Sequence, residues 1–197
     1  MQQPPAPSVA EEMQSPPPSS LTYNEAVGQP GHFGWNVRPG PPVPQSEAGG
    51  ADVWKDDRNG GVPLDAFVGG YDNERKIYVG RAHFKDGLIP GKVVPQHGKA
   101  FIPWGCKEHA LDSYEVLCGN NGKYDWMPTT IQREVPSNAV IGGYSEGNRD
   151  TLYICRIVTK DGNHAIGKVH HRCENGFVPY GGKELNTGVF EILVRLF

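Results

Sequence analysis

The sequence has no apolar run approaching the about 18 residues that cross a lipid bilayer, so we expect no membrane-spanning segment. It also has no excess of positive charge, because 19 lysine and arginine residues stand against 22 aspartate and glutamate residues. A domain that binds nucleic acid needs a basic face to neutralise phosphates, and this balance argues against one. The opening segment MQQPPAPSVAEEMQ has neither a cationic start nor an apolar stretch, so we expect no secretory signal.

Cysteine is scarce, and the sequence contains no Cys-x-x-Cys pair. The four cysteines are Cys106, Cys118, Cys155 and Cys173. Without a secretory signal, they are expected to remain free thiols in a reducing compartment. The sequence therefore predicts a cytoplasmic protein, with vesicle association or unconventional release as alternatives.

Proline, by contrast, is concentrated at the start of the chain, where residues 1–50 hold 11 of the 18 prolines. Proline fixes φ and cannot donate a backbone hydrogen bond, and the few apolar residues of this stretch cannot offset the entropy of ordering it. We predict that residues 1–50 form a disordered tail. The tail serves as a spacer, or its segment HFGWNVRPG (32–40) docks in an aromatic groove of a protein partner.

The rest of the chain contains two copies of one sequence unit. VGGY at 68–71 recurs as IGGY at 141–144, and FIPWGCKE at 101–108 recurs as FVPYGGKE at 177–184. Five further matches keep the same order: Trp54 with Trp126, IYVGR at 77–81 with LYICR at 152–156, KDG at 85–87 with KDG at 160–162, PGKV at 90–93 with IGKV at 166–169, and YEVL at 114–117 with FEIL at 190–193. Ordered matches at a nearly constant offset predict an internal repeat. We assign residues 51–122 to the first repeat and residues 123–197 to the second.

Each copy is typical of short strands separated by turns. In the first copy the strand candidates are Lys76–Phe84, Leu88–Val94, Lys99–Trp104 and Ser113–Cys118, with a hairpin turn at Asp86-Gly87. Pro103 favours an edge strand or a bulge for the third of these. No stretch of ten residues has a helical period, so we predict an all-β, mostly antiparallel fold. A unit of about 70 residues buries too little surface alone, and we expect the two repeats to pack with pseudo-twofold symmetry.

Paired glycines follow an apolar segment in each copy, at Gly69-Gly70 and Gly142-Gly143. We favour a sharp bend as the reason for them, with close approach of another part of the protein as the alternative. Either arrangement leaves the residues after Tyr71 and Tyr144 at the rim of a turn, where a ligand could reach them.

These linked motifs closely resemble the DM-nine repeat family, small tandem-repeat proteins common in insects and molluscs, over residues 54–197 and in both copies. Characterised members include mannose-binding lectins built from two tandem repeats. Their sugar sites use an acidic residue just after the paired glycines and the lysine of the PGKV motif. Other members are infection-responsive or vesicle-associated proteins. The resemblance therefore implies a lectin-like protein with a mannose-type ligand, and pathogen recognition in innate immunity as its setting.

Carried onto this chain, the resemblance places the first sugar site at Asp72 and Lys92. A carboxylate accepts sugar hydroxyls and an ammonium donates to them, and hydrogen bonds to charged groups contribute about 1.5–3 kcal/mol each. Tyr71 or Trp104 could stack on the sugar ring or belong to the core. We expect Asp72 and Lys92 to lie side by side, facing water; the alternative is a solvated ion pair without a ligand.

The second copy departs from this pattern, because Ser145 takes the place of Asp72 while Lys168 is retained. A serine hydroxyl is a weaker, neutral acceptor. The second site is therefore either rescued by Glu146 or Asp150 or degraded, and the two sites are expected to be unequal.

Enzymatic and metal sites have less support. Glu108 and His109 near Cys106 could suggest a nucleophile with its base, but the second copy lacks both the cysteine and the histidine. The segment HHRC at 170–173 offers metal ligands without a second cysteine pair. We expect no enzymatic activity, no metal and no cofactor.

The sequence thus predicts a protein that binds mannose-type glycans through Asp72, Lys92, Lys168 and Glu146. A homodimer would supply the avidity that a shallow site needs. The competing hypothesis is an intracellular scaffold whose proline-rich tail recruits protein partners.

Overall fold

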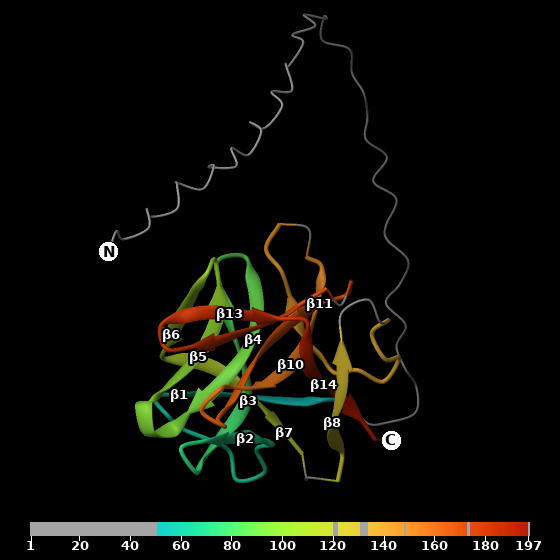
Figure 1. The fold of residues 1–197 in the computed structure, drawn as a ribbon. Helices are drawn as coiled ribbons and strands as arrows, with labels where there is room; N and C mark the ends of the chain where they lie inside the picture. The colour runs from blue at the N-terminus through green and yellow to red at the C-terminus, as the bar shows by residue number, and fades with distance from the viewer. Residues whose placement is uncertain (1–50, 120–121, 131–133, 148, 173, 197) are drawn as a thin grey trace, which may run out of the picture. The chain divides into compact units, whose positions relative to one another are not determined.

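The structure is a computed structural model that describes residues 51–119, 122–130, 134–147, 149–172 and 174–196 (Figure 1). The strands of the first repeat are β1 (Val53–Arg58), β2 (Val68–Asp72), β3 (Arg75–Phe84), β4 (Gly87–Val94), β5 (Lys99–Trp104), β6 (Lys107–Leu111) and β7 (Ser113–Cys118), with the 3-10 helix η1 (Pro95–His97) after β4. Those of the second repeat are β8 (Tyr124–Thr130), β9 (Ile141–Tyr144), β10 (Thr151–Val158), β11 (His164–His170), β12 (Gly176–Tyr180), β13 (Lys183–Thr187) and β14 (Val189–Arg195). The tail predicted over residues 1–50 lies outside the described residues.

The strand order of the sheet reads the same from both ends. It runs β1-β7-β3-β4-β5-β6-β13-β12-β11-β10-β14-β8, so each strand of the first repeat has its counterpart seven strands later at the equivalent place. The two halves meet where Lys107 of β6 pairs with Lys183 of β13. This order confirms the predicted all-β fold of two antiparallel repeats related by pseudo-twofold symmetry. Within the described ranges, no helix has the length and hydrophobicity to span a bilayer.

The strands that carry the paired glycines reach across to the opposite repeat. The Tyr71 N–H in β2 lies 3.1 Å from His164 Nδ1 in β11, and β9 pairs with β4 through Tyr144 and Leu88. A Cβ on Gly143 would lie 2.0 Å from the Leu88 carbonyl oxygen, and one on Gly70 would lie 2.7 Å from His164 Cβ. Neither glycine has a positive φ. Close approach between the repeats therefore explains why glycine occupies these positions. The strand register also shifts beside the glycines in both repeats, so a local irregularity accompanies the close approach.

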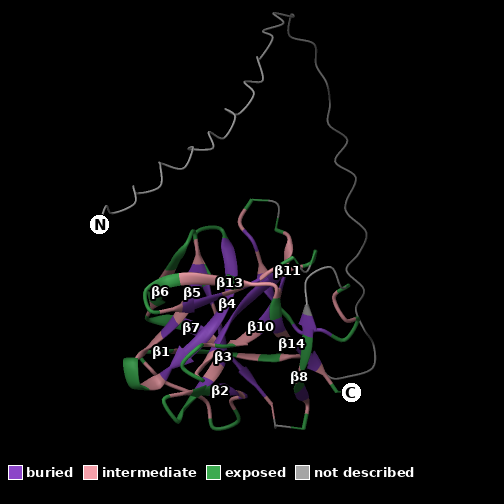
Figure 2. Cartoon of the chain, viewed as in Figure 1, coloured by how far each residue is buried: buried purple, intermediate pink, exposed green. Residues whose placement is uncertain are grey.

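Among the described residues, three clusters of buried apolar side chains make up the core. One consists of second-repeat residues, and another consists of first-repeat residues together with Leu152 of the second repeat. The third is shared, with Ile77 and Val79 from the first repeat packed with Ile154 and Ile166 from the second. Burial follows the inner strands, and β4 is buried along its whole length (Figure 2). The side chains of β3 alternate between two of these clusters: Ile77 and Val79 belong to the shared cluster, whereas Ala82 belongs to the cluster formed mainly by the first repeat.

Two local predictions need correction. The hairpin turn after β3 consists of Lys85 and Asp86, with Lys85 at φ 52°, while Gly87 already pairs with Phe84 in β4. β5 is an inner strand between β4 and β6, so the prediction of an edge strand is wrong. Proline has no backbone N–H to donate to a neighbouring strand. Pro103 is tolerated in β5 because the pairing of β5 with β4 ends at Phe101, two residues before the proline.

Candidate functional site

The structure brings Asp72 and Lys92 together, but not on the open surface. Lys92 Nζ lies 4.0 Å from Asp72 Oδ2 and 4.0 Å from Glu108 Oε1. Lys92 is only 4% exposed, so the expectation of a water-facing lysine is wrong. The reason is its position in β4, where it pairs with residues of β3 and β5 on either side. The two carboxylates are less buried and lie nearer the surface.

The ammonium of Lys92 has charged neighbours but no hydrogen bond of 3.5 Å or less to any described residue. The only fully buried side-chain polar atom without a partner in the described part of the chain is Trp126 Nε1, so Lys92 Nζ keeps contact with solvent. Burial lowers the pKa of Lys92, while Glu108 and Asp72 oppose the shift. Lys92 is therefore a largely desolvated donor at the base of a polar site, and the described residues accept no hydrogen bond from it.

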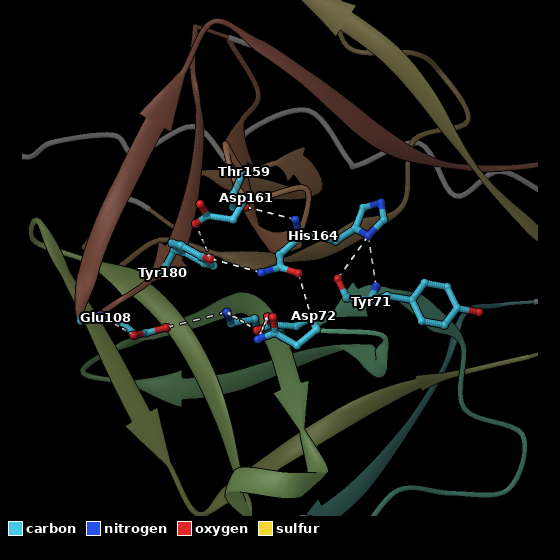
Figure 3. Close-up of polar contacts among 11 residues, drawn as sticks. Tyr71, Asp72, Glu108, Thr159, Asp161, His164 and Tyr180 are labelled. Carbon is cyan, nitrogen blue, oxygen red and sulfur yellow. Dashed lines mark hydrogen bonds and ion pairs between the residues drawn. The ribbon is translucent and has the colours of Figure 1, made fainter.

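The second repeat completes this first site. The Tyr180 ring lies 5.2 Å from Lys92 Nζ, and Glu108 Oε2 accepts the Gly182 N–H at 2.6 Å. Beside Asp72, the Asn73 N–H donates to Asn163 Oδ1 at 2.9 Å. Figure 3 shows Asp72, Glu108 and Tyr180 converging from three directions. The site therefore consists of two carboxylates, one ammonium and one aromatic ring, contributed by both repeats.

The equivalent lysine of the second repeat is already bound. Lys168 Nζ donates to the Pro103 carbonyl oxygen at 2.7 Å and lies 3.2 Å from Glu184 Oε1, under the Trp104 ring. Burial lowers the pKa of Lys168 too, and Glu184 opposes that shift. Glu184 Oε2 in turn accepts the Cys106 N–H at 2.8 Å. The ammonium of Lys168 is thus held by the protein's own groups.

Glu146 does not restore the carboxylate that the second site lacks. Its Oε2 lies 3.7 Å from Lys85 Nζ, and among the described residues it forms no ion pair with Lys168 within 4.0 Å. Ser145 is buried, and its N–H donates to the Asp150 carbonyl oxygen at 2.9 Å. Among the described residues, Lys168 therefore has one carboxylate within 4.0 Å, that of Glu184, where Lys92 has two, and Glu146 raises the pKa of Lys168 only from a longer distance.

Neither aromatic residue proposed to stack on a sugar at Asp72 lies over that site. Tyr71 is 48% exposed, and its ring points away from Asp72 (Figure 3). Trp104 covers Lys168 of the second site instead.

His109, which the sequence offered as a base beside Cys106, packs within the first repeat. Its ring centroid lies 4.4 Å from that of Phe84, and its Nε2 lies 3.0 Å from the Trp104 carbonyl oxygen.

Sequence reasoning missed Glu108 as a ligand-site residue, and it missed Tyr180 and Asn163 altogether. The sequence does contain a signal for Glu108, because a Lys-Glu pair recurs at the same place in both copies, in CKE (106–108) and GKE (182–184). The segment HHRC depends partly on Cys173, which lies outside the described residues.

Comparison with known proteins assigns the class of the molecule. The family model of the DM9 repeat matches residues 72–187, and the chain belongs to the DM9 (DM-nine) repeat family. A similar solved structure is that of the nematode sperm cell motility protein MFP2B, with a TM-score of 0.55 and 18% identity. The match covers 79% of this chain and 49% of that chain, so this protein spans about half the length of its structural neighbour. The likeness shows a shared fold. None of the curated proteins matches the sequence.

Proposed function

We propose that this protein binds carbohydrate, with a mannose-type sugar as the ligand, at Asp72, Lys92 and Glu108. The observation that carries the proposal is the buried Lys92 ammonium, which lies 4.0 Å from each of two carboxylates and has no hydrogen bond to the described residues. Burying a charged donor without hydrogen bonds is costly, and such groups are retained where a ligand supplies the partner. Membership of the DM9 repeat family supports the same proposal.

Sugar hydroxyls fit this arrangement because each can donate and accept. A hydroxyl oxygen forms hydrogen bonds of about 2.7–3.0 Å, so one oxygen can reach both Lys92 and a carboxylate across a 4.0 Å gap. The Tyr180 ring, 5.2 Å from Lys92 Nζ, offers an apolar surface to the sugar's C–H groups. A shallow site of this kind binds a monosaccharide at about millimolar strength, near −4 kcal/mol.

We propose one sugar site per chain, in the first repeat. The donors of Lys168 are engaged by Pro103 and Glu184, so a ligand at the second site would have to displace them. Avidity on a glycan-bearing surface would then come from a homodimer or from clustering of chains.

Titration of the full chain with methyl α-mannoside, followed by NMR chemical shifts, tests the site. We expect saturable binding, and a loss of about tenfold or more in affinity in Asp72→Asn and in Lys92→Met, since hydrogen bonds to charged groups contribute about 1.5–3 kcal/mol. Ser145→Ala is the matched control and should bind like the wild type. Absence of saturable binding, or affinity unchanged in both site variants, would overturn the proposal.

We propose further that the protein acts without chemical turnover, in the cytoplasm, as a recogniser of pathogen glycans. Cys106 and Cys118 form no disulfide with any described residue, which supports a reducing compartment. Cell fractionation and binding to mannan-coated particles test this setting. Deletion of residues 1–50 should leave sugar binding intact. Partner capture that depends on residues 1–50, in a protein that binds no sugar, would favour a scaffold instead.

A further inference from the structure

We infer that the sugar site continues from Asp72 and Lys92 onto the β10–β11 hairpin of the second repeat, and that this extension holds the second residue of an oligosaccharide. The inference rests on the proposed function of the first site. The hairpin loop spans residues 159–163 and reaches the site through the hydrogen bond between Asn163 and Asn73. Asp161 of the same loop lies beside Tyr180 (Figure 3).

Hydrogen bonds link the buried lysine site to the exposed tip of this hairpin. Asn163 Oδ1 accepts the N–H of Asn73, the neighbour of Asp72, at 2.9 Å. Asn163 Nδ2 donates to Tyr180 Oη at 3.4 Å, and Tyr180 Oη donates to Asp161 Oδ2 at 3.3 Å. Since the Tyr180 ring also faces Lys92, polar groups line one continuous path outward from the ammonium.

The groups along this path have the chemistry of a sugar subsite. Asp161 is an exposed carboxylate that accepts hydroxyls, Asn163 carries an amide that can donate and accept, and the Tyr180 hydroxyl can do both. The two bonds at 3.3 and 3.4 Å are longer than an optimal hydrogen bond. Sugar hydroxyls can therefore replace them at little cost.

The loop that presents these groups is fixed by its own backbone. The Thr159 N–H donates to the Asn163 carbonyl oxygen at 2.8 Å, and the Gly162 N–H donates to the Thr159 carbonyl oxygen at 3.0 Å. The Asn163 N–H also donates to Thr159 Oγ1 at 3.2 Å. A loop already held in one conformation loses less entropy when a ligand binds.

The hairpin of the first repeat offers no such extension to the second site. It has a two-residue turn, and its Lys85 Nζ lies 3.7 Å from Glu146 Oε2 and 5.4 Å from the Trp104 ring. The position equivalent to Asn163 is Gly87, because each stands five residues before the lysine of its repeat, Lys168 or Lys92. The amide is therefore specific to the hairpin beside Asp72, so the extension belongs to the first site alone.

The test compares methyl α-mannoside with linkage isomers of α-linked mannobiose, titrated into the full-length protein. We expect at least one disaccharide to bind about five- to tenfold more tightly than the monosaccharide, the gain from one or two added hydrogen bonds. In the variant Asp161→Asn, which replaces the charged acceptor by a neutral amide, most of this gain should disappear, while monosaccharide affinity stays within about twofold of wild type. Asp86→Asn, in the hairpin of the first repeat, is the matched control and should keep the gain.

Three results would overturn the extension. If every disaccharide binds like the monosaccharide and binding still depends on Asp72, the extension is wrong while the proposed function stands. If Asp161→Asn weakens both sugars equally, Asp161 acts only by holding the Tyr180 ring at the first site. If neither sugar binds, the proposed function fails and the extension fails with it. The wild-type comparison needs no variant, so poor folding of Asp161→Asn would not leave the inference untested.

Discussion

The two lysine sites share a scaffold and differ in what the ammonium binds. Lys92 and Lys168 follow the same Gly-Lys-Val motif, and each has a glutamate sixteen residues later. Both lysines are 4% exposed. Lys168 is held by Pro103 and Glu184 at 2.7 and 3.2 Å, whereas Lys92 lies 4.0 Å from each carboxylate. Of two equivalent buried cations, one therefore ties the repeats together and the other remains available to a ligand.

Replacing each lysine by methionine should separate these two roles most clearly. Lys168→Met leaves Glu184 buried without its cation, and breaking a buried ion pair costs about 3–5 kcal/mol. Lys92→Met removes an ammonium that has no hydrogen bond to the described residues, so relief from its burial offsets the lost attraction, and we expect the free energy of unfolding to change by less than about 1 kcal/mol. Urea unfolding of the two variants measures the difference. Equal losses would show that both lysines are structural.

The paired glycines should also respond unequally to alanine. A Cβ on Gly143 meets the Leu88 carbonyl oxygen at 2.0 Å, which cannot move without separating β4 from β9. A Cβ on Gly70 meets the His164 side chain at 2.7 Å. We expect Gly143→Ala to cost about 3 kcal/mol and Gly70→Ala about 1–2 kcal/mol, since overpacking penalties depend on how far the neighbour can yield. Thermal unfolding provides the comparison, and the reverse order would contradict it.

Restoring a carboxylate to the second site should not restore binding. In Ser145→Asp the Lys168 donors remain engaged by Pro103 and Glu184, so we expect titration with methyl α-mannoside to show one site per chain, as in the wild type. The buried position of residue 145 should also lower the melting temperature. Two sites per chain in this variant would show that the missing carboxylate alone distinguishes the two copies.

The smallest expected effect is a decline of sugar affinity at alkaline pH. Burial holds the pKa of Lys92 below its usual 10.5, so raising the pH deprotonates it before an exposed lysine would respond. Only the ammonium is a charged donor, so affinity should fall severalfold as the pH rises from neutral through that lowered pKa. Over the same interval the unfolded chain binds more protons, so the lysine's contribution to the free energy of unfolding rises with pH. Titrations at several pH values measure the first effect, and constant affinity up to about pH 10.5 would contradict it.

The doubled unit and its strands could be predicted from local pattern. The observed bounds of β5 (Lys99–Trp104) and β7 (Ser113–Cys118) agree with the prediction because apolar alternation and flanking turn residues identify a strand without reference to the rest of the molecule. β6 escaped prediction because its charged residues 107 and 108 mask the alternation. The proximity of Asp72 and Lys92 was predicted only through resemblance to a family.

The remainder of the site depends on contacts between repeats. Tyr180 and Asn163 reach the first site from the second copy, and no pattern within one copy shows which face another copy will cover. The burial of Lys92 was missed for a related reason. Lysine is almost never buried in proteins, so sequence alone favours a solvated side chain.

The shared apolar cluster determines how the protein can be divided. Ile77 and Val79 pack with Ile154 and Ile166, so separating the repeats would expose the middle of the core of both. Heat or denaturant should therefore melt the whole β region in one cooperative transition. A fragment ending at residue 122 would retain Asp72, Lys92 and Glu108 but would lack the Tyr180 ring and the Gly182 N–H. The smallest unit that could carry the proposed sugar site is consequently the pair of repeats.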